Sequence, residues 1–122
     1  MSNATVFSAD RFTFVVVDGV DLTRPGIYEW EIEGVGIYIG KYKRISRPQR
    51  AYARSVANLL ANRPYRKSRQ DRFRGIHHAL ADAVRQKRNV KLTILENPPA
   101  WKINSRELEL IAERGTLNRT GR

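Results

Sequence analysis

Two tyrosines near the start of the chain, Tyr28 and Tyr38, combine a chemically useful side chain with a spacing that brings them together. Each belongs to a short β-like run, and Glu33-Gly34-Val35 between the runs predicts a three-residue hairpin loop. In that hairpin Tyr28 faces Gly40 and Tyr38 faces Trp30, which places both phenols on one face of the sheet, about 7–8 Å apart as diagonal neighbours. Two phenols on a rigid ribbon, with a glycine leaving room opposite one of them, form a candidate chemical site.

A carboxylate at position 107 stands where a predicted helix meets the core. Glu107 precedes Leu110 and Ile111 by three and four residues, so it lies at the margin of the buried face of that helix. A carboxylate beside a core needs a partner, and a hard cation is a suitable one. The alternative is structural, because Asn104 and Glu107 have the spacing of a capping box. From the spacing alone, the cap is the favoured interpretation.

The positive charge is concentrated in one part of the chain. The formal net charge is +11, and residues 41–74 hold twelve Lys or Arg against one acid, Asp71, so this block alone accounts for the whole excess. Such a block attracts a polyanion, and nucleic acid is the favoured partner. A solvated basic face, or a surface for an acidic protein or lipid, is the alternative. The basic residues predicted to contact nucleic acid are Lys43, Arg44, Arg47 and Arg54.

Aromatic residues interleave with these arginines and have two interpretations. Tyr52, Tyr65 and Phe73 could stack on bases. Aromatic side chains in such positions more often seat helices and loops, and this second interpretation is the favoured one.

Composition excludes several classes of protein. The 122 residues fit one domain. The absence of cysteine excludes disulfides and thiolate metal sites. The first residues lack the pattern of a signal peptide, and the longest apolar run, around Phe14–Val17, is too short to cross a bilayer. We therefore expect a cytoplasmic protein with no membrane partner.

The helices and strands that must position these residues are predicted from the spacing of apolar residues, and Gly and Pro indicate where they end. Apolar residues recur at helical spacing in two central segments, through Ala53, Val56 and Leu60 in the first and Ile76 and Leu80 in the second. The predicted helices are 48–62, 71–87 and 105–114, and the predicted strands are 12–17, 90–95 and the two arms of the 26–40 hairpin. The order β-β-α-α-β-α predicts an α+β fold with a small three-stranded antiparallel sheet flanked by helices. Residues 12–17 add an extra strand within an N-terminal extension, 1–24, to the domain proper, 25–122.

Two tripeptides in the hairpin, Gly26-Ile27-Tyr28 and Tyr38-Ile39-Gly40, resemble the signature of the GIY-YIG nuclease family. The segment Glu107-Leu108-Glu109-Leu110-Ile111 is similar to the Glu-x-x-x-Ile pattern that carries the family's metal-binding glutamate. Leu117-Asn118 stands where a late asparagine usually follows. The resemblance covers residues 25–118, and it reverses the preference for a cap at Glu107.

The resemblance implies a divalent-metal-dependent endonuclease acting on DNA. Glu107 would hold Mg²⁺ or Mn²⁺, and Tyr28 or Tyr38 would take a proton from the attacking water. Lys41 resembles a lysine found directly after the second tripeptide in some members, and a nearby ammonium favours the phenolate. Specificity would come from a homodimer or from a partner protein. The alternative is a non-catalytic, basic nucleic-acid-binding module that retains the fold.

The catalytic arginine of the family is missing from its usual position in this chain. Members commonly carry it eight residues beyond the last glycine of the signature, and this chain has Pro48 there. Arg50 is preferred over Arg47, because it lies three residues before Ala53 on the core-facing stripe. The alternative for either arginine is contact with phosphate without a catalytic role.

A histidine and an asparagine complete the predicted contacts. Some relatives touch phosphate with a histidine in the region of His77, although a half-buried helix histidine is the commoner case. Adjacent His77 and His78 cannot both face one metal, since helical neighbours point about 100° apart. Asn118 is expected to lie close to the bound DNA.

Overall fold

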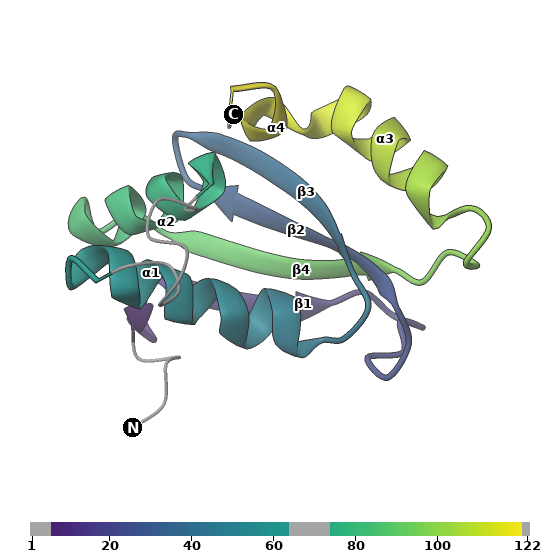
Figure 1. The fold of residues 1–122 in the computed structure, drawn as a ribbon, viewed down its shortest axis with the longest axis horizontal. Helices are drawn as coiled ribbons and strands as arrows, with labels where there is room; N and C mark the ends of the chain where they lie inside the picture. The colour runs from purple at the N-terminus through teal and green to yellow at the C-terminus, as the bar shows by residue number, and fades with distance from the viewer. Residues whose placement is uncertain (1–5, 64–73, 121–122) are drawn as a thin grey trace.

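The computed structural model describes residues 6–63 and 74–120, without the side chains of 119 and 120. Four strands and four α-helices follow one another in these ranges (Figure 1). The strands are β1 (Phe12–Val16), β2 (Gly26–Ile32), β3 (Gly36–Tyr42) and β4 (Val90–Glu96). The helices are α1 (Tyr52–Leu60), α2 (Gly75–Arg85), α3 (Ile103–Arg114) and α4 (Thr116–Thr120), and a π-helical turn, Arg47–Ala51, leads into α1. No helix among these residues is long and apolar enough to cross a bilayer.

The strands form one mixed sheet in the order β1-β4-β2-β3. Strand β2 runs antiparallel to both of its neighbours, β3 and β4, whereas β1 is parallel to β4. The predicted α+β fold is therefore confirmed, with the extra N-terminal strand added at the edge beside β4.

The hairpin has the predicted register. Tyr28 pairs with Gly40 and Trp30 pairs with Tyr38. Gly34, at φ +75° in the connecting loop, adopts the left-handed backbone that glycine accepts at least cost. A Cβ at position 40 would collide with the Tyr28 ring, so the glycine opposite this tyrosine is a steric requirement.

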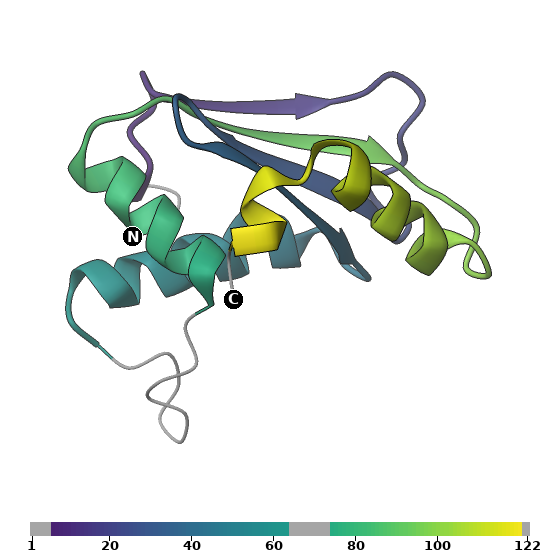
Figure 2. The same ribbon diagram turned by 90° about the horizontal axis from the view of Figure 1, so that it is seen from above.

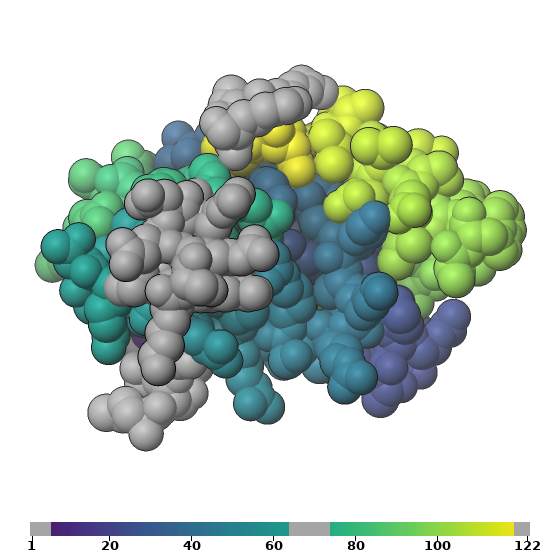
Figure 3. All heavy atoms as spheres, viewed as in Figure 1, coloured from purple at the N-terminus to yellow at the C-terminus, as the bar shows by residue number. Residues whose placement is uncertain are grey.

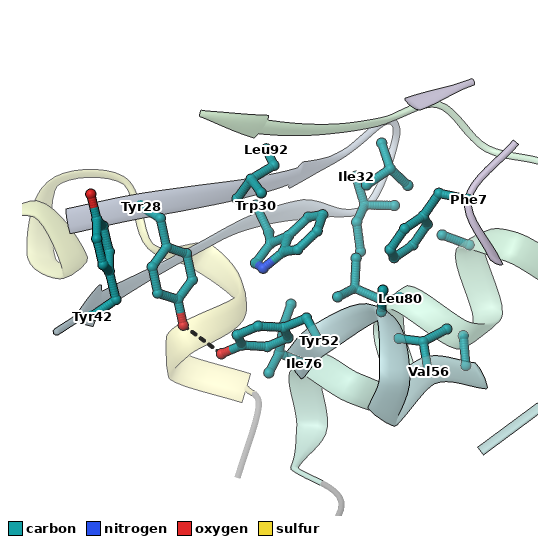
Figure 4. Close-up of a cluster of buried hydrophobic side chains, with 14 of the residues drawn as sticks. Phe7, Tyr28, Trp30, Ile32, Tyr42, Tyr52, Val56, Ile76, Leu80 and Leu92 are labelled. Atoms are coloured by element: carbon teal, nitrogen blue, oxygen red, sulfur yellow. Dashed lines mark hydrogen bonds between the residues drawn. The ribbon is translucent and has the colours of Figure 1, made fainter. Parts of the chain in front are cut away.

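The main core lies between one face of the sheet and helices α1 and α2 (Figure 2). Strand alternation points Tyr28, Trp30 and Ile32 into it from β2, as Figure 4 shows. Their neighbours on β4 and the helices complete it, and the largest of these are Leu92, Ile94, Tyr52, Val56, Ile76 and Leu80. This core fixes the face on which the two signature tyrosines project.

Helix α3 covers part of the opposite face. Ile27 and Ile39 point to that face and pack with Leu110. Glu29 is also buried there, only 3% exposed, and Arg114 from α3 forms an ion pair with it, with Nε 2.9 Å from Oε1. The pairing anchors the C-terminal end of α3 on β2.

Polar side chains of α4 cover the outer edge of β3. The Ile37 N–H donates to Thr116 Oγ1 at 2.9 Å. Asn118 pairs twice with Ile39, accepting its N–H at 2.7 Å and donating to its carbonyl at 2.8 Å. These side chains satisfy the backbone of an edge strand that would otherwise be open to another chain.

Candidate active site

A buried pair of tyrosines forms the inner part of the candidate site. The hydroxyl oxygens of Tyr28 and Tyr52 lie 2.5 Å apart and share a hydrogen bond (Figure 4). Tyr28 is only 2% exposed, and burial, followed by the neighbouring Tyr52 phenol, raises its pKa well above the usual value. Tyr28 is thus a neutral group that holds Tyr52 in place.

Tyr38 is the more accessible phenol. It is partly exposed, and Arg74 lies beside it, with Nη1 3.4 Å from the Tyr38 hydroxyl and Nη2 donating to Tyr52 at 2.9 Å. Burial raises the pKa of Tyr38 to about 12, and the Tyr52 phenol adds to this, while the Arg74 charge acts in the opposite direction. Two phenols, Tyr38 and Tyr52, therefore contact one guanidinium, and Tyr28 bonds to the second of them.

The two candidate arginines differ in their surroundings. The guanidinium carbon of Arg47 lies 5.4 Å from the centre of the Tyr52 ring, a cation–π contact. Arg50 is exposed on the π-helical turn and lines a surface groove. The preference for Arg50 is therefore not supported by this geometry, which places Arg47 against the tyrosines.

Lys41 does not lie where the sequence suggested. It alternates with Gly40 along β3 and so projects on the face opposite to Tyr38. Its Nζ donates to Asn104 Oδ1 on α3. The ammonium that was expected beside a phenol is on the other side of the strand, and Arg74 occupies the place beside Tyr38.

Glu107 lies at the β3 edge, and it does not form the predicted capping box. Helix α3 begins at Ile103, its N-cap is Lys102, and no side chain caps it. Burial raises the pKa of Glu107, whereas the Lys41 charge and a hydrogen bond with the Lys41 backbone lower it. The Glu107 charge also raises the pKa of Tyr38, as the smallest of the contributions.

His77 and Asn118 both have structural partners. His77 is 1% exposed, and its Nδ1 accepts the Arg74 backbone N–H at 3.0 Å, which caps α2. Its ring packs against Tyr52 at 5.2 Å between centroids. Burial, then the Arg74 charge, lowers the His77 pKa to about 4. A buried neutral imidazole cannot contact DNA phosphate, and the Asn118 amide is engaged with β3.

A groove lined by cations begins at the end of β3, and its lining residue Arg47 contacts the Tyr52 ring. It has a volume of about 630 Å³ and is bordered by the end of β3, the following loop and the start of α1. The predicted nucleic-acid contacts Lys43, Arg44, Arg47 and Arg54 all line it, together with Lys41 and Arg50. These four residues therefore share one surface, and their contact with nucleic acid stays a prediction.

The oxygen ligands that a metal could use are few. Within residues 6–63 and 74–120, no three His, Asp or Glu side chains come together. Glu107 is a half-buried carboxylate that bonds to the Lys41 backbone, and the Lys41 side chain donates to Asn104. Mg²⁺ is commonly held by one or two carboxylates with water and substrate phosphate, so a site of this kind fits the residues present.

Tyr52 and Arg74 are the members that sequence reasoning missed. The 1% exposure of Tyr52 supports the interpretation favoured from the sequence, in which it seats a helix, but its hydrogen bond with Tyr28 was not predicted. Arg74 counted only as one cation of the basic block. Tyr65 and Phe73 lie outside the described residues. The position of Tyr52 on the Ala53–Val56 side of α1 was the available signal.

Comparisons of the chain with protein-family models, with curated proteins and with solved structures gave no match.

Proposed function

We propose that this protein is a divalent-metal-dependent endonuclease of the GIY-YIG type, which hydrolyses phosphodiester bonds in DNA. The observation that carries the proposal is the position of Tyr38 on β3, with Arg74 beside its hydroxyl and Glu107 bonded to the Lys41 backbone of the same strand. Phosphodiester hydrolysis needs a group that orients water, a cation for the phosphate and an oxygen ligand for a metal ion. These three side chains supply one of each, and Lys41, whose backbone bonds to Glu107, lines the groove of cations.

Glu107 would hold the metal ion, with the remaining ligands coming from water and from the DNA. A bound Mg²⁺ or Mn²⁺ supplies Lewis-acid stabilisation of the charge that develops on the phosphate oxygens. The half-buried position of Glu107 supports this role, because the charge of a cation compensates for the lost hydration of the carboxylate.

Tyr38 is the better candidate for contact with the attacking water. Tyr28 is buried and its hydroxyl is engaged with Tyr52, whereas Tyr38 is partly exposed. Burial holds the pKa of Tyr38 at about 12, so its neutral phenol would orient the water, and the Arg74 charge acts in the direction that the resemblance implied for Lys41. Arg47, held against the Tyr52 ring, would neutralise charge on the phosphate.

A binding module without catalysis is the second candidate, and one observation favours it. The hydrogen bond between Glu107 and the Lys41 backbone belongs to the same row as those of Thr116 and Asn118 along β3. In that case Glu107 covers the strand edge and has no need of a metal.

Conversion of supercoiled plasmid to nicked or linear DNA, with and without Mg²⁺, separates the two. Glu107→Gln is the informative variant, because its amide oxygen can still accept the Lys41 N–H while the metal-binding charge is lost. We expect Mg²⁺-dependent cleavage by the wild type and none by Glu107→Gln, with DNA binding and folding retained. Cleavage that survives in Glu107→Gln would remove Glu107 from the metal site, and an inactive wild type with tight salt-sensitive binding would favour the binding module.

A further inference from the structure

A second pocket lies at the end of the sheet, next to the cation-lined groove. It has a volume of about 630 Å³ and is built from three segments that are far apart in sequence. Figure 3 shows these segments meeting on one face, the chain before β2 in indigo, the end of β3 in blue and the chain before α3 in yellow-green. Its lining residues are Arg24, Pro25, Lys41, Tyr42, Lys43, Pro98, Ala100, Ile103 and Asn104.

The lining joins an apolar surface to a positive rim. Proline, alanine and isoleucine side chains supply apolar contacts, while Arg24, Lys41 and Lys43 supply charge. None of the described residues that line the pocket is acidic. A ligand that matches both features has a flat, weakly polar body attached to an anionic group, and a nucleotide has this chemistry.

Trp101 follows the lining residue Ala100 and is 84% exposed. Its indole therefore presents a large, flat, apolar face that a ligand can reach. Indole faces stack on nucleobases with little regard to sequence. The tryptophan therefore adds a stacking surface to the segment that forms one wall of the pocket.

Two lysines connect the pocket to the candidate active site. Lys41 and Lys43 line both the pocket and the cation-lined groove, and the Lys41 backbone bonds to Glu107. A DNA strand that follows the groove would therefore contact Lys41 and Lys43 and then enter the pocket. The nucleotide at that point would be adjacent to the phosphate that the proposed function puts beside Glu107.

We infer that this pocket binds the base of an unpaired nucleotide next to the scissile phosphate, so that the protein acts on single-stranded or splayed DNA in preference to continuous duplex. That the neighbouring phosphate is the one cleaved rests on the proposed function. The base-binding step itself requires no cleavage and is measured without a metal ion. In duplex DNA the base is stacked and paired, and it cannot enter a pocket without being flipped out.

Tryptophan fluorescence tests this directly, because Trp30 is 1% exposed and Trp101 is the tryptophan that a ligand can reach. The probes are a short oligothymidylate, an abasic deoxyribose-phosphate strand with the same number of phosphates, and a blunt duplex, each in buffer without divalent ions. We expect quenching by oligothymidylate and little quenching by the other two. Equal quenching by the abasic strand, or none by oligothymidylate, would overturn the inference.

Charge-adding variants give predictions of opposite sign. Trp101→Lys removes the ring and adds a cation, so a purely electrostatic surface would bind oligothymidylate more tightly, whereas stacking predicts binding weaker by about tenfold. Leu108→Lys is the matched control, since Leu108 is an apolar α3 residue that is 64% exposed and does not line the pocket. We expect slightly tighter binding for this control. Tighter binding by both variants would assign Trp101 to another partner, such as a protein, and would overturn the inference.

The two proposals fail separately. Quenching by oligothymidylate in a protein that never cleaves DNA would leave the base pocket and remove the nuclease. Cleavage of continuous duplex with no base-dependent quenching would leave the nuclease and remove the pocket.

Discussion

The hydroxyl groups of Tyr28 and Tyr52 share a hydrogen bond of 2.5 Å across the core, between β2 and α1. Arg74 donates to the same Tyr52 hydroxyl at 2.9 Å. The buried phenol pair thus connects the sheet to the guanidinium that lies beside Tyr38.

Tyr52→Phe should destabilise the protein and disturb the site. It leaves the Tyr28 hydroxyl buried without this partner, which costs about 1–3 kcal/mol of the free energy of unfolding. The double variant Tyr28→Phe/Tyr52→Phe should lose less than the sum of the two single losses, because it removes both polar groups. Urea unfolding of the four proteins measures the coupling, and strictly additive losses would show that the hydrogen bond contributes nothing.

Gly40→Ala should displace the Tyr28 ring. The new methyl group meets that ring directly, and overpacking of this kind costs about 1–3 kcal/mol. Tyr28→Ala opens the space, so the Gly40→Ala penalty should shrink in that background. Thermal unfolding of the single and double variants provides the comparison. If Gly40→Ala destabilised both backgrounds equally, the cause would be the backbone at position 40 and not the Tyr28 ring.

His77 should make stability depend on pH. Its pKa falls from about 6.5 in the unfolded chain to about 4 in the folded protein, so the unfolded state binds more protons between these values. The contribution of neutral His77 to the free energy of unfolding is fully present above pH 6.5. It is lost as the pH falls towards 4, by on the order of 3 kcal/mol. His77→Asn keeps an acceptor for the Arg74 N–H and should flatten this part of the profile.

The exposed neighbour His78 is the matched control for that experiment. His78→Asn should leave the pH dependence of unfolding unchanged. If wild type and His77→Asn lost stability equally between pH 6.5 and pH 4, His77 would not be the cause of that loss.

Arg114→Met should leave Glu29 buried without its ion pair. Loss of one partner of a buried charge costs about 1–3 kcal/mol or more at neutral pH. Burial already raises the pKa of Glu29, and removal of Arg114 raises it further, so the folded state takes up a proton more readily than the unfolded state as the pH falls. The difference in free energy of unfolding between Arg114→Met and wild type should therefore become smaller as the pH falls from 7 to 5. Urea unfolding at both pH values measures it. A deficit that stays constant would argue for lost packing by the arginine stem.

Arg47 and Arg50 should differ in single-turnover cleavage. Arg47 lies against Tyr52, so Arg47→Gln should slow the chemical step by about a hundredfold if the proposed nuclease activity holds. Arg50→Gln should weaken binding at low DNA concentration and leave the rate at saturating DNA unchanged. The reverse pattern would restore Arg50 as the catalytic arginine.

The sequence predicted the features that depend on local pattern. A three-residue loop between alternating runs sets the register that pairs Tyr28 with Gly40, and the structure confirms it. The margin position of Glu107 followed from its spacing to Leu110, and Glu107 is half-buried as expected.

The remaining features depend on contacts between distant segments. Arg50 was placed on the core-facing stripe by regular α-helical spacing, but the π-helical turn Arg47–Ala51 contains more residues per turn and changes the phase before Tyr52. The predicted cap at Asn104 does not form, because a lysine from β3 binds that side chain instead. No local pattern reports that Arg74 bonds to Tyr52.

The contacts of Asn118 with β3 also set an order of events during synthesis. Ile39 and Asn118 are 79 residues apart in the chain, and Glu107 meets the same strand from the neighbouring helix. A ribosome-bound chain therefore exposes the cations after β3 long before the carboxylate has emerged. The nascent protein can attract nucleic acid at that stage, and its candidate catalytic centre is completed only when the C-terminal helices dock.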